Sequence, residues 1–321
     1  MVLRNLFSDH AMKKIAICLT CMLMLIVLIF HPDRHSKYYT FIAIVDTYKE
    51  LFFNSFEINK NVSKCSADFY KRLIESKREA VLQNIYVSKH FISPAHGGEY
   101  ANDNCNPMFS VAIIVPYRNR TAQLQMFVNY MHYFLQEQKV HYRLFIVEQS
   151  DRLPFNRAKM MNVGALVAMK MNYSCLILHD VDLLPLNLQN IYACSNKPRH
   201  MSSSIDTFRY NLPYLELCGG VLSIQSSQFR KINGMSNFFY GWGGEDDDLF
   251  KRLQKYDLTP DRLSPEVSVY TMILHKKEMA SATRLENLKY STDRQETDGL
   301  NTIGNNHEVH LKSLYTHILV F

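Results

Sequence analysis

The sequence contains few glycines and prolines, which allow or impose special backbone conformations, and few cysteines, which form disulfide cross-links. It has 11 glycines, 10 prolines and 7 cysteines in 321 residues, and a single tryptophan, Trp242. This composition excludes a collagen-like chain and a small disulfide-rich scaffold. Wholesale disorder is also excluded, because 47% of the residues are hydrophobic and only 21% are charged. We find no internal repeat, and the length suits one large domain or two small ones.

Net charge is scarce in most of the chain. Residues 1–90 hold 13 Lys and Arg against 8 Asp and Glu, whereas residues 91–321 hold 23 against 22. A nearly neutral body lacks the broad basic face with which nucleic-acid binders contact phosphates. We therefore expect no nucleic acid among the partners of this protein.

Only one long apolar run occurs, the sixteen uncharged residues Ile15–Phe30, and Lys13 and Lys14 precede it. A cleaved signal peptide begins in the same way, but no small-residue cleavage pattern follows the run, which favours an uncleaved anchor. Basic residues on the short N-terminal side predict a cytoplasmic tail over 1–14 and a span over 15–30. The rest of the chain would then face the lumen.

Cysteines and glycosylation sequons fit a lumenal location. Five cysteines lie beyond the anchor, and an oxidising compartment would permit two bridges and one free thiol. Acceptor sequons begin at Asn61, Asn119 and Asn172. Asn61 lies in the polar region 31–100, which we expect to be a lumenal stem, and it is the best glycan candidate. A catalytic domain is expected over 101–321.

The body begins with alternating strand and helix patterns. The β-branched run Ser110–Pro116 predicts a buried strand, and Thr121–Gln138 has apolar residues at helical spacing. A strand at Tyr142–Val147, a helix over Arg157–Met171 and a strand at Cys175–His179 follow. This order predicts an α/β fold with a single, mostly parallel, Rossmann-like sheet and right-handed crossovers.

Acidic residues directly follow the third predicted strand, in the motif Asp180-Val-Asp182. Strand spacing lets the two carboxylates converge, and such oxygen ligands suit Mg²⁺ or Mn²⁺ beside a diphosphate. A solvated turn is the alternative for an isolated motif of this kind. Residues 116–120 and Glu148 end the other two strands, and ligands bind at the carboxyl ends of such sheets. The shared edge favours a ligand site.

A second motif, Tyr240–Asp248, joins glycines, an aromatic ring and four acids. Glycines on both sides of Trp242 allow a closing loop, and its ring could stack on a sugar. Acids at the start of a helix also complement the helix dipole, which explains the acids alone. The aromatic residue between glycines is what indicates a sugar site.

Met272 and His275 form a third candidate group. A lone histidine is more often a structural hydrogen-bonding residue than a ligand. Two ligands three residues apart can nevertheless reach one ion. Methionine is a soft ligand, and together with Asp and His it would favour Mn²⁺ over Mg²⁺.

Taken in order, the motifs resemble those of the animal β-1,4-galactosyltransferase family of the Golgi, which has the GT-A fold. The resemblance covers residues from about 105 to 318 with collinear spacing. The matching segments are Val115-Pro-Tyr-Arg-Asn-Arg120, Phe155-Asn-Arg-Ala-Lys159, Asn162-Val-Gly164, Asp180-Val-Asp-Leu-Leu-Pro185, Pro198-Arg-His200, Gly219-Gly-Val221, Gly241-Trp-Gly-Gly-Glu-Asp-Asp-Asp248 and Thr297-Asp-Gly-Leu-Asn301.

The resemblance implies an inverting, Mn²⁺-dependent transferase. Such an enzyme moves a hexose or N-acetylhexosamine from a UDP-sugar donor to the 4-hydroxyl of a terminal β-GlcNAc on a glycoprotein or glycolipid. It also implies a single-pass type II Golgi membrane protein with a lumenal catalytic domain. Two disulfides, Cys65–Cys105 and Cys175–Cys194, are carried over from the family, and Cys218 would stay free.

Site roles follow from the same resemblance. Asp246 matches the catalytic base, with Glu245, Asp247 and Trp242 around the acceptor sugar. Asp182, Met272 and His275 match the metal ligands. Donor and acceptor binding would fall to a larger set: Pro116, Tyr117, Arg118, Arg120, Phe155, Arg157, Val181, Asp182, Leu217, Gly244, Arg284 and Leu285. A glycan on Asn119 would block this donor loop, so we expect that sequon to be unused.

Departures from the family pattern bear on the substrates. Leu217 stands two residues before Gly219, where galactose-using relatives carry tyrosine. A smaller apolar side chain leaves room for an acetamido group, which predicts UDP-GalNAc as the donor, as in the invertebrate N-acetylgalactosaminyltransferase branch, with UDP-Gal the alternative. Thr207 replaces a common lysine, whose charge Arg209 could supply. Leu285 replaces a phenylalanine of the acceptor pocket.

Two other classes of function compete with a transferase. A non-catalytic sugar-binding protein could use the same scaffold, but the retention of Asp182, His275, Trp242 and Asp246 favours an enzyme. A glycosidase could use Glu245 and Asp246 as its acid pair. Neighbouring residues on one backbone segment are poorly placed to flank a glycosidic bond from opposite sides, so this hypothesis ranks last.

Overall fold

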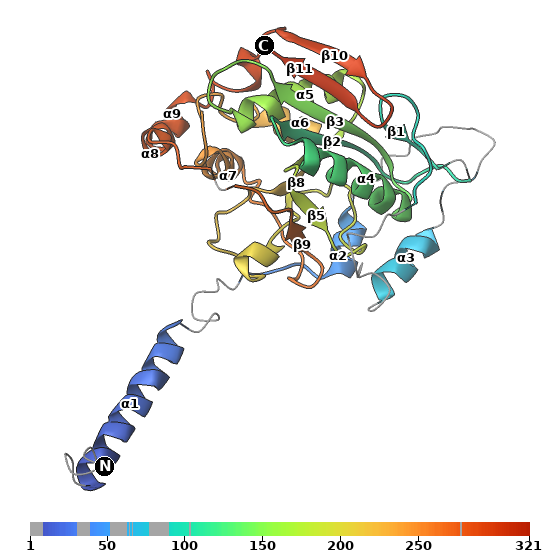
Figure 1. Cartoon of the computed structure of the whole chain (residues 1–321). Helices are drawn as coiled ribbons and strands as arrows, with labels where there is room; N and C mark the ends of the chain where they lie inside the picture. Colours follow the sequence, from blue (N-terminus) through green and yellow to red (C-terminus); the bar gives the residue numbers. More distant parts are fainter. Residues whose placement is uncertain are drawn as a thin grey trace.

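The computed structural model describes residues 9–30, 39–51, 63, 65, 67–76, 90–102, 104–276 and 278–321. Helix α1 (Asp9–Phe30) stands apart from the globular body (Figure 1). Its segment Ala11–Ile29 is the one helix of the described residues that is long and apolar enough to cross a membrane, and none of it is buried in the body. The span predicted over 15–30 lies in this helix.

The body is built on a mixed sheet whose strands run in the order β10-β11-β3-β2-β4-β8-β6, with β1 also paired to β3. The centre is parallel: β3 pairs in parallel with β2 and β11, and β2 also with β4. The central strands are β2 (Ser110–Tyr117), β3 (His141–Gln149), β4 (Cys175–His179) and β11 (Thr316–Val320). Antiparallel strands complete it: β1 (Glu99–Tyr100), β6 (Arg199–His200), β8 (Val221–Gln225) and β10 (His307–Leu311). The predicted α/β fold is confirmed.

Two crossover helices, α4 (Thr121–Glu137) and α5 (Arg157–Lys170), cover opposite faces of the sheet. Alternate residues of β2 explain the arrangement: Val111 and Ile113 pack in the core under α4, whereas Ile114 packs in the core under α5. Every residue of β2 is buried, which is why its sequence is a continuous apolar run rather than an alternating one. At Gly164 of α5 a Cβ would lie 2.5 Å from Ile114, so only glycine permits this close approach.

A small second sheet continues from the main one. Its order is β5-β9-β7, formed by β5 (Leu183–Pro185), β9 (Val269–Met272) and β7 (Ser204–Ile205). β5 follows β4 after only residues 180–182, and Leu183 pairs with Met272 across the β5–β9 ladder. This register brings the end of β9 next to the acidic turn, although the two are about ninety positions apart in the chain.

The helical elements that follow β4 and α5 in the chain are all shorter than the two crossover helices. The longest is α7 (Glu245–Lys255), whose first turn is the acidic run of the sequence. The others are α6 (Ser226–Lys231), α8 (Arg284–Lys289), α9 (Ser291–Arg294), η2 (Asp206–Phe208) and η3 (Leu300–Thr302).

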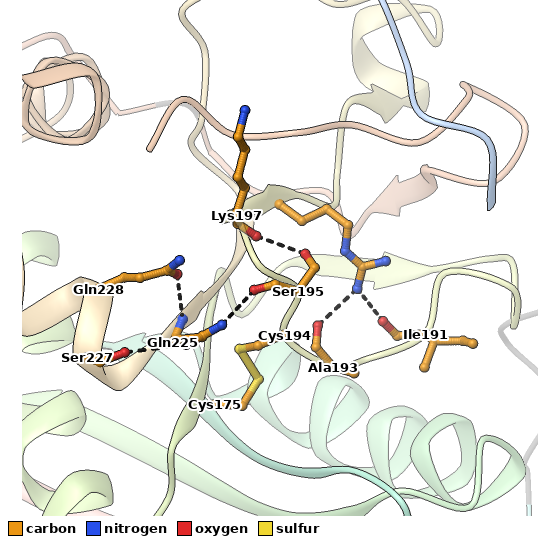
Figure 2. The surroundings of a disulfide bond; sticks show 10 residues. Cys175, Ile191, Ala193, Cys194, Ser195, Lys197, Gln225, Ser227 and Gln228 are labelled. Carbon is orange, nitrogen blue, oxygen red and sulfur yellow. Dashed lines mark hydrogen bonds between the residues drawn. A yellow bond between two sulfur atoms is a disulfide. The ribbon is translucent and has the colours of Figure 1, made fainter. Parts of the chain in front are cut away.

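Both disulfides that the family resemblance implies are present, Cys65–Cys105 and Cys175–Cys194, and Cys218 is buried and free. The second bridge ties the start of β4 to the loop after β5 (Figure 2). Beside it Gln225 Nε2 donates to Ser195 O at 2.9 Å, and Ser195 Oγ donates to Lys197 O at 2.8 Å (Figure 2). The bridge therefore sits in a hydrogen-bonded loop that leads into β6.

Described parts of the region 31–100, which we expect to be the stem, pack on the body. Helices α2 (Ile44–Glu50) and α3 (Ala67–Glu75) lie against it. Ile42 N donates to Arg262 O at 2.9 Å, and the Tyr70 side chain is fully buried. The sequon at Asn61 lies outside the described residues, and the domain boundary at residue 100 stays a prediction.

Candidate active site

The turn after β2 carries the first group of predicted donor-binding residues. Pro116 and Tyr117 end the buried strand β2, and Asn119 is an exposed turn residue with φ 52°. The Arg118 guanidinium lies 5.3 Å from the Phe155 ring centroid and donates to Leu153 O at 2.6 Å. The segment 153–155 thus stacks against the turn. Phe155 O in turn accepts a hydrogen bond from Gly241 N at 2.8 Å, which links this segment to the tryptophan loop.

A buried arginine joins the two acidic motifs. Arg157, at the start of α5, contacts Asp180 Oδ1 with Nε at 2.6 Å and Glu245 Oε1 with Nη1 at 3.8 Å. The sequence alone suggests that Asp180 and Asp182 converge on one ion. Instead, the structure ties Asp180 to Arg157 and turns Asp182 toward His275. The two carboxylates of the motif therefore have different partners.

Asp182, Met272 and His275 do come together. His275 Nε2 lies 2.7 Å from Asp182 Oδ2, and Ile273 N donates to Asp182 O at 2.7 Å, next to Met272 in β9. His275 Nδ1 bonds to Lys276 O at 2.9 Å, so in the neutral ring Nε2 carries the lone pair that faces Asp182. Burial and the nearby Asp180 raise the pKa of Asp182 to about 6.

These three residues offer an oxygen, a nitrogen and a sulfur ligand. No group of three or more His, Cys, Asp and Glu side chains that could hold a metal occurs in the described part of the chain. A metal site here therefore depends on the thioether of Met272, as the sequence indicates. The mixed donor set fits Mn²⁺ better than Mg²⁺, which prefers oxygen ligands.

Asp206 fixes the strand end that carries Met272. Its Oδ1 accepts from Met272 N at 3.1 Å, and its Oδ2 accepts from the Thr271 hydroxyl. Thr207, at the position where the family commonly has lysine, donates its hydroxyl to Met272 Sδ at 3.6 Å. Arg209, which we considered as a replacement for that cation, is exposed and has φ 55°. Thr207 thus directly contacts Met272, the predicted metal ligand.

The first turn of α7 brings Asp246, the predicted base, close to the segment 214–219 that precedes β8. Gly244 precedes it with φ 94°, a conformation that favours glycine. A Cβ at Gly219 would lie 2.7 Å from Asp246 Oδ2, so the Asp246 carboxylate occupies space that any other residue at 219 would fill. Cys218 Sγ donates to Asp246 O at 3.2 Å, and Tyr214 OH donates to Asp247 Oδ1 at 2.9 Å.

Burial makes the carboxyls of this turn harder to ionise. The pKa of Glu245 rises to about 7, chiefly through burial and then through the neighbouring Asp246. Burial, then Asp247, raises the pKa of Asp246, while Arg157 opposes this shift. Glu245 Oε2 is buried without a hydrogen-bond partner among the described residues. A buried acceptor of this kind can receive a hydroxyl group of a ligand.

A buried ion network holds α7 in place. Arg252 bonds to Asp248 Oδ2 at 2.7 Å within the helix, and donates to Asp298 O at 2.8 Å. Asp298 also accepts from Asn237 N at 2.8 Å and from the Ser236 hydroxyl. The Thr297-to-Asn301 motif is therefore part of the support of α7 rather than a ligand-contacting segment.

The remaining predicted site residues differ in how exposed they are to solvent. Trp242 is 54% exposed and Leu285 is 67% exposed, as expected for residues that would meet a large substrate. Ser281 N donates to Trp242 O at 2.9 Å, and the Arg284 side chain lies against Gly243. Val181 is buried and Leu217 is partly buried. Arg120 Nη1 has no hydrogen-bond partner among the described residues, and its Nη2 lies 3.7 Å from Glu278.

Two findings differ from what strand ends alone suggest. Glu148 is paired with His317 of β11, Oε2 to Nε2 at 2.8 Å, and lies on that side of the sheet. Gln149, not singled out in the sequence, orders the loop to Phe155: its Oε1 accepts from Asn156 N at 2.7 Å. Asp206 and Tyr214 were missed because their partners lie 66 and 33 residues away in sequence. Gln149 has local partners, but no sequence motif marks it.

Comparisons with known proteins agree with this architecture. Residues 66–195 match the N-terminal region of glycosyl transferase group 7, and residues 199–276 match the N-terminal domain of galactosyltransferase. Rat β-1,4-galactosyltransferase 6 is 38% identical over 266 residues, which is 82% of this chain and 66% of the relative. Chinese hamster β-1,4-galactosyltransferase 4 is 38% identical over 229 residues, 70% of this chain and 67% of the relative. The chain thus spans about two thirds of the length of these relatives.

A solved structure extends the comparison. A variant of Drosophila β-1,4-galactosyltransferase 7 in complex with manganese, UDP-Gal and xylobiose superposes with a TM-score of 0.56 at 29% identity. The match covers 66% of this chain and 94% of that one. The fold and the acidic residues at its edge place the chain in the GT-A fold class. Within that class, the chain belongs to the animal β-1,4-galactosyltransferase family.

Proposed function

We propose that this protein transfers N-acetylgalactosamine, or galactose, from its UDP-sugar to the 4-hydroxyl of a terminal β-GlcNAc, with inversion. The observation that carries the proposal is the placement of Asp246 against Gly219, on the edge that also holds the Asp182–His275 pair. With that placement, Asp246 would be a carboxylate base beside a candidate metal–diphosphate site. Family membership and the complex of the Drosophila relative with UDP-Gal and manganese support the reaction class.

In the proposed reaction Asp246 removes the proton of the acceptor hydroxyl. The freed oxygen pair forms a bond to the anomeric carbon of the donor, and the bond to UDP breaks on the opposite side. The raised pKa of Asp246 makes its carboxylate a better proton acceptor than an exposed aspartate. Trp242 and Leu285, both exposed, would cover the sugars and exclude water when substrates are bound.

Asp182, Met272 and His275 would hold Mn²⁺. When bound there, the ion would neutralise the negative charge of the departing diphosphate. Arg120 is suited to the same anion, because its Nη1 is buried without a partner among the described residues. Arg118, stacked on Phe155, offers a second cation at the turn after β2. We assign the nucleotide to this end of the site.

The donor is the finer part of the proposal. Leu217 is partly buried and directly precedes Cys218 and Gly219, the two residues that approach Asp246. Tyrosine at this position would crowd the C2 substituent of the donor sugar, whereas leucine leaves room for an acetamido group. UDP-Gal is the second candidate, and it is favoured by one observation: the similar curated relatives are galactosyltransferases.

We further propose a Golgi, single-pass type II location. α1 would span the membrane, residues 1–14 would lie in the cytosol, and the body from about residue 101 would be the lumenal catalytic domain. The apolar segment Ala11–Ile29, which lies outside the body, supports an anchor. Both disulfides of the body support an oxidising lumen.

The test is a product analysis with the detergent-solubilised full chain. The protein is incubated with Mn²⁺, a GlcNAc-terminated acceptor, and UDP-GalNAc or UDP-Gal in parallel, and the mass of the product is measured. A gain of N-acetylhexosamine supports both the reaction and the donor, and Leu217→Tyr should then shift the preference toward UDP-Gal. A gain of hexose alone contradicts the donor assignment. No product, with UDP still bound, contradicts the assigned acceptor.

A further inference from the structure

Three backbone carbonyls of the segment 215–219, just before β8, are held by two buried side chains. Arg262 Nη2 donates to Leu215 O and to Leu217 O, both at 2.8 Å. His200 Nε2 bonds to Gly219 O at 3.0 Å. Alternate residues from 215 to 219 are thus fixed along one side. The side chain at 217 is the proposed donor-selecting group, and Gly219 is the residue against which Asp246 packs.

The two holding side chains are joined to each other. Arg262 Nε donates to His200 Nδ1 at 3.1 Å, so Nδ1 accepts and the ring proton is on Nε2, which donates to Gly219 O. Burial lowers the pKa of His200 to about 3, so the ring is neutral and this arrangement of donors is retained at physiological pH. Arg262 therefore also orients the histidine that holds Gly219.

The exposed side of this arginine is covered by the segment that follows the membrane helix. The Tyr39 ring centroid lies 5.6 Å from the Arg262 guanidinium carbon. Tyr39 OH bonds to Ser203 Oγ at 2.8 Å and donates to Leu263 O at 3.1 Å, and Ile42 N donates to Arg262 O. Arg262 forms no ion pair with a carboxylate in the described part of the chain, and it is 7% exposed. The tyrosine ring is a cation–π partner of the guanidinium on that side.

We propose that Tyr39, Arg262 and His200 form a positioning unit through which the juxtamembrane segment sets the donor pocket. The unit touches no reacting atom. It fixes the path of residues 215–219, and with it the place of the Leu217 side chain and the space left for the Asp246 carboxylate. This inference rests on the proposed function, because it concerns the donor pocket of that site. Small displacements of such a segment are expected to reduce donor binding and turnover.

The same geometry makes the segment 39–43 part of the enzyme. A chain that lacks it would leave the Arg262 guanidinium facing water and free to turn away from the two carbonyls. Because the described residues 39–51 run along the body and lead back to α1 (Figure 1), the unit also connects the membrane side of the molecule to its donor site. The sequence alone predicts only a stem for the region 31–100, which includes this segment.

The test compares two matched pairs of variants in the solubilised full chain. Arg262→Lys keeps the charge but cannot donate to two carbonyls and His200 together, and Arg230→Lys, an exposed arginine of α6, is its control. Tyr39→Ala removes the ring, whereas Tyr39→Phe keeps the ring and removes only the hydroxyl bonds. The readouts are donor KM, kcat, the ratio of the two UDP-sugars, and the melting temperature.

We expect Arg262→Lys to raise the donor KM about tenfold and to change the UDP-GalNAc to UDP-Gal ratio, with a smaller change for Tyr39→Ala, about threefold. Tyr39→Phe should lie nearer to wild type, and Arg230→Lys should equal it. Folded Arg262→Lys and Tyr39→Ala proteins with wild-type KM and donor ratio overturn the inference. If Arg262→Lys does not fold, the Tyr39 pair decides alone, because Tyr39 lies on a surface segment.

Failure of the proposed function gives a different pattern. If the wild type forms no product, UDP-sugar affinity with Mn²⁺ replaces turnover as the readout. Weaker binding by Tyr39→Ala than by Tyr39→Phe then supports the positioning unit on its own, and equal binding overturns it. A wild-type chain that neither transfers nor binds a UDP-sugar overturns both.

Discussion

Asp246 can face the proposed donor pocket because residue 219 has no side chain. A Cβ at Gly219 would lie 2.7 Å from Asp246 Oδ2, closer than such atoms approach in folded proteins. The atom that must give way is the carboxylate itself, at the end of a flexible side chain. A larger residue at 219 should therefore displace the base while leaving the fold intact.

The first prediction follows from this contact. Gly219→Ala should lower kcat at least about tenfold, since a displaced base loses its reach to the acceptor hydroxyl, with little change in melting temperature. The matched control is Gly304→Ala, where no heavy atom lies within 4 Å of the added Cβ. Steady-state kinetics and thermal melts of both variants check it. Full activity of Gly219→Ala would contradict the placement of Asp246.

Glu245 gives a prediction for stability against pH. Its pKa is raised to about 7 in the folded state, from an ordinary value of 4.5. The folded protein therefore holds this proton more tightly than the unfolded chain does. The free energy of unfolding should fall as the pH rises from about 4.5 to 7, and it should stay lower above that range.

Neutral glutamine removes this dependence. Relative to wild type, Glu245→Gln should melt higher at pH 8 by the equivalent of about 1–3 kcal/mol, while the difference should shrink at pH 5, where the glutamate is protonated. Melting temperatures at the two pH values are the measurement. If the melting temperature of Glu245→Gln differs from that of wild type by the same amount at both pH values, Glu245 does not change its ionisation between them and the prediction is contradicted.

At the scale of the element, α7 depends on a neighbouring loop for its position. Its acidic first turn lies partly buried at the proposed donor site, while Arg252 in its third turn is tied to Asp248 and to Asp298 from the loop before η3. Removing one member of a buried ion network leaves the others unpaired, which is strongly destabilising. The support is thus specific to these side chains.

Asp298→Ala should lower the free energy of unfolding by about 3–5 kcal/mol and reduce transfer through misplaced acids of α7. Asp298→Asn should be milder, because its amide oxygen can still accept from Asn237 N and its NH2 group can donate to the Ser236 hydroxyl oxygen. Chemical denaturation of the two variants checks the order. Equal stability of Asp298→Ala and wild type would contradict the role of this loop.

Elements with local signals were predictable from the sequence. The runs at 110–116 and 175–179 became β2 and β4, and the helical spacing at 157–171 became α5. The second sheet was not predictable. β5 and β7 have three and two residues, and they are stable only through β9, which comes from much later in the chain. Short strands of this kind carry no periodicity of their own.

In the candidate site, too, residues in local motifs could be predicted and contacts between distant segments could not. Asp182 and Asp246 were found from their motifs, because the motif residues are contiguous in sequence. The split of Asp180 to Arg157, and of Asp182 to His275, depends on how two loops meet in space. Asp206, which fixes Met272, was not singled out from the sequence, because its partner lies 66 residues away.

At the scale of the whole molecule, the N-terminal tail and the body should lie on opposite sides of the membrane that α1 spans. In sealed microsomes, a tag at the C-terminus should resist protease until detergent is added, whereas a tag at the N-terminus should be removed at once. Lys13 and Lys14 before the span predict this orientation. Digestion of the C-terminal tag without detergent would contradict the type II topology.

The most direct test of the central claim is a comparison of Asp246→Asn with wild type in two assays, sugar transfer with Mn²⁺ and UDP-sugar binding. Asparagine keeps the shape of the side chain but cannot accept the proton of an acceptor hydroxyl at neutral pH. The account predicts that transfer falls by about a hundredfold or more while donor affinity changes little. Undiminished transfer by Asp246→Asn, or the absence of any transfer by the wild type, would contradict it.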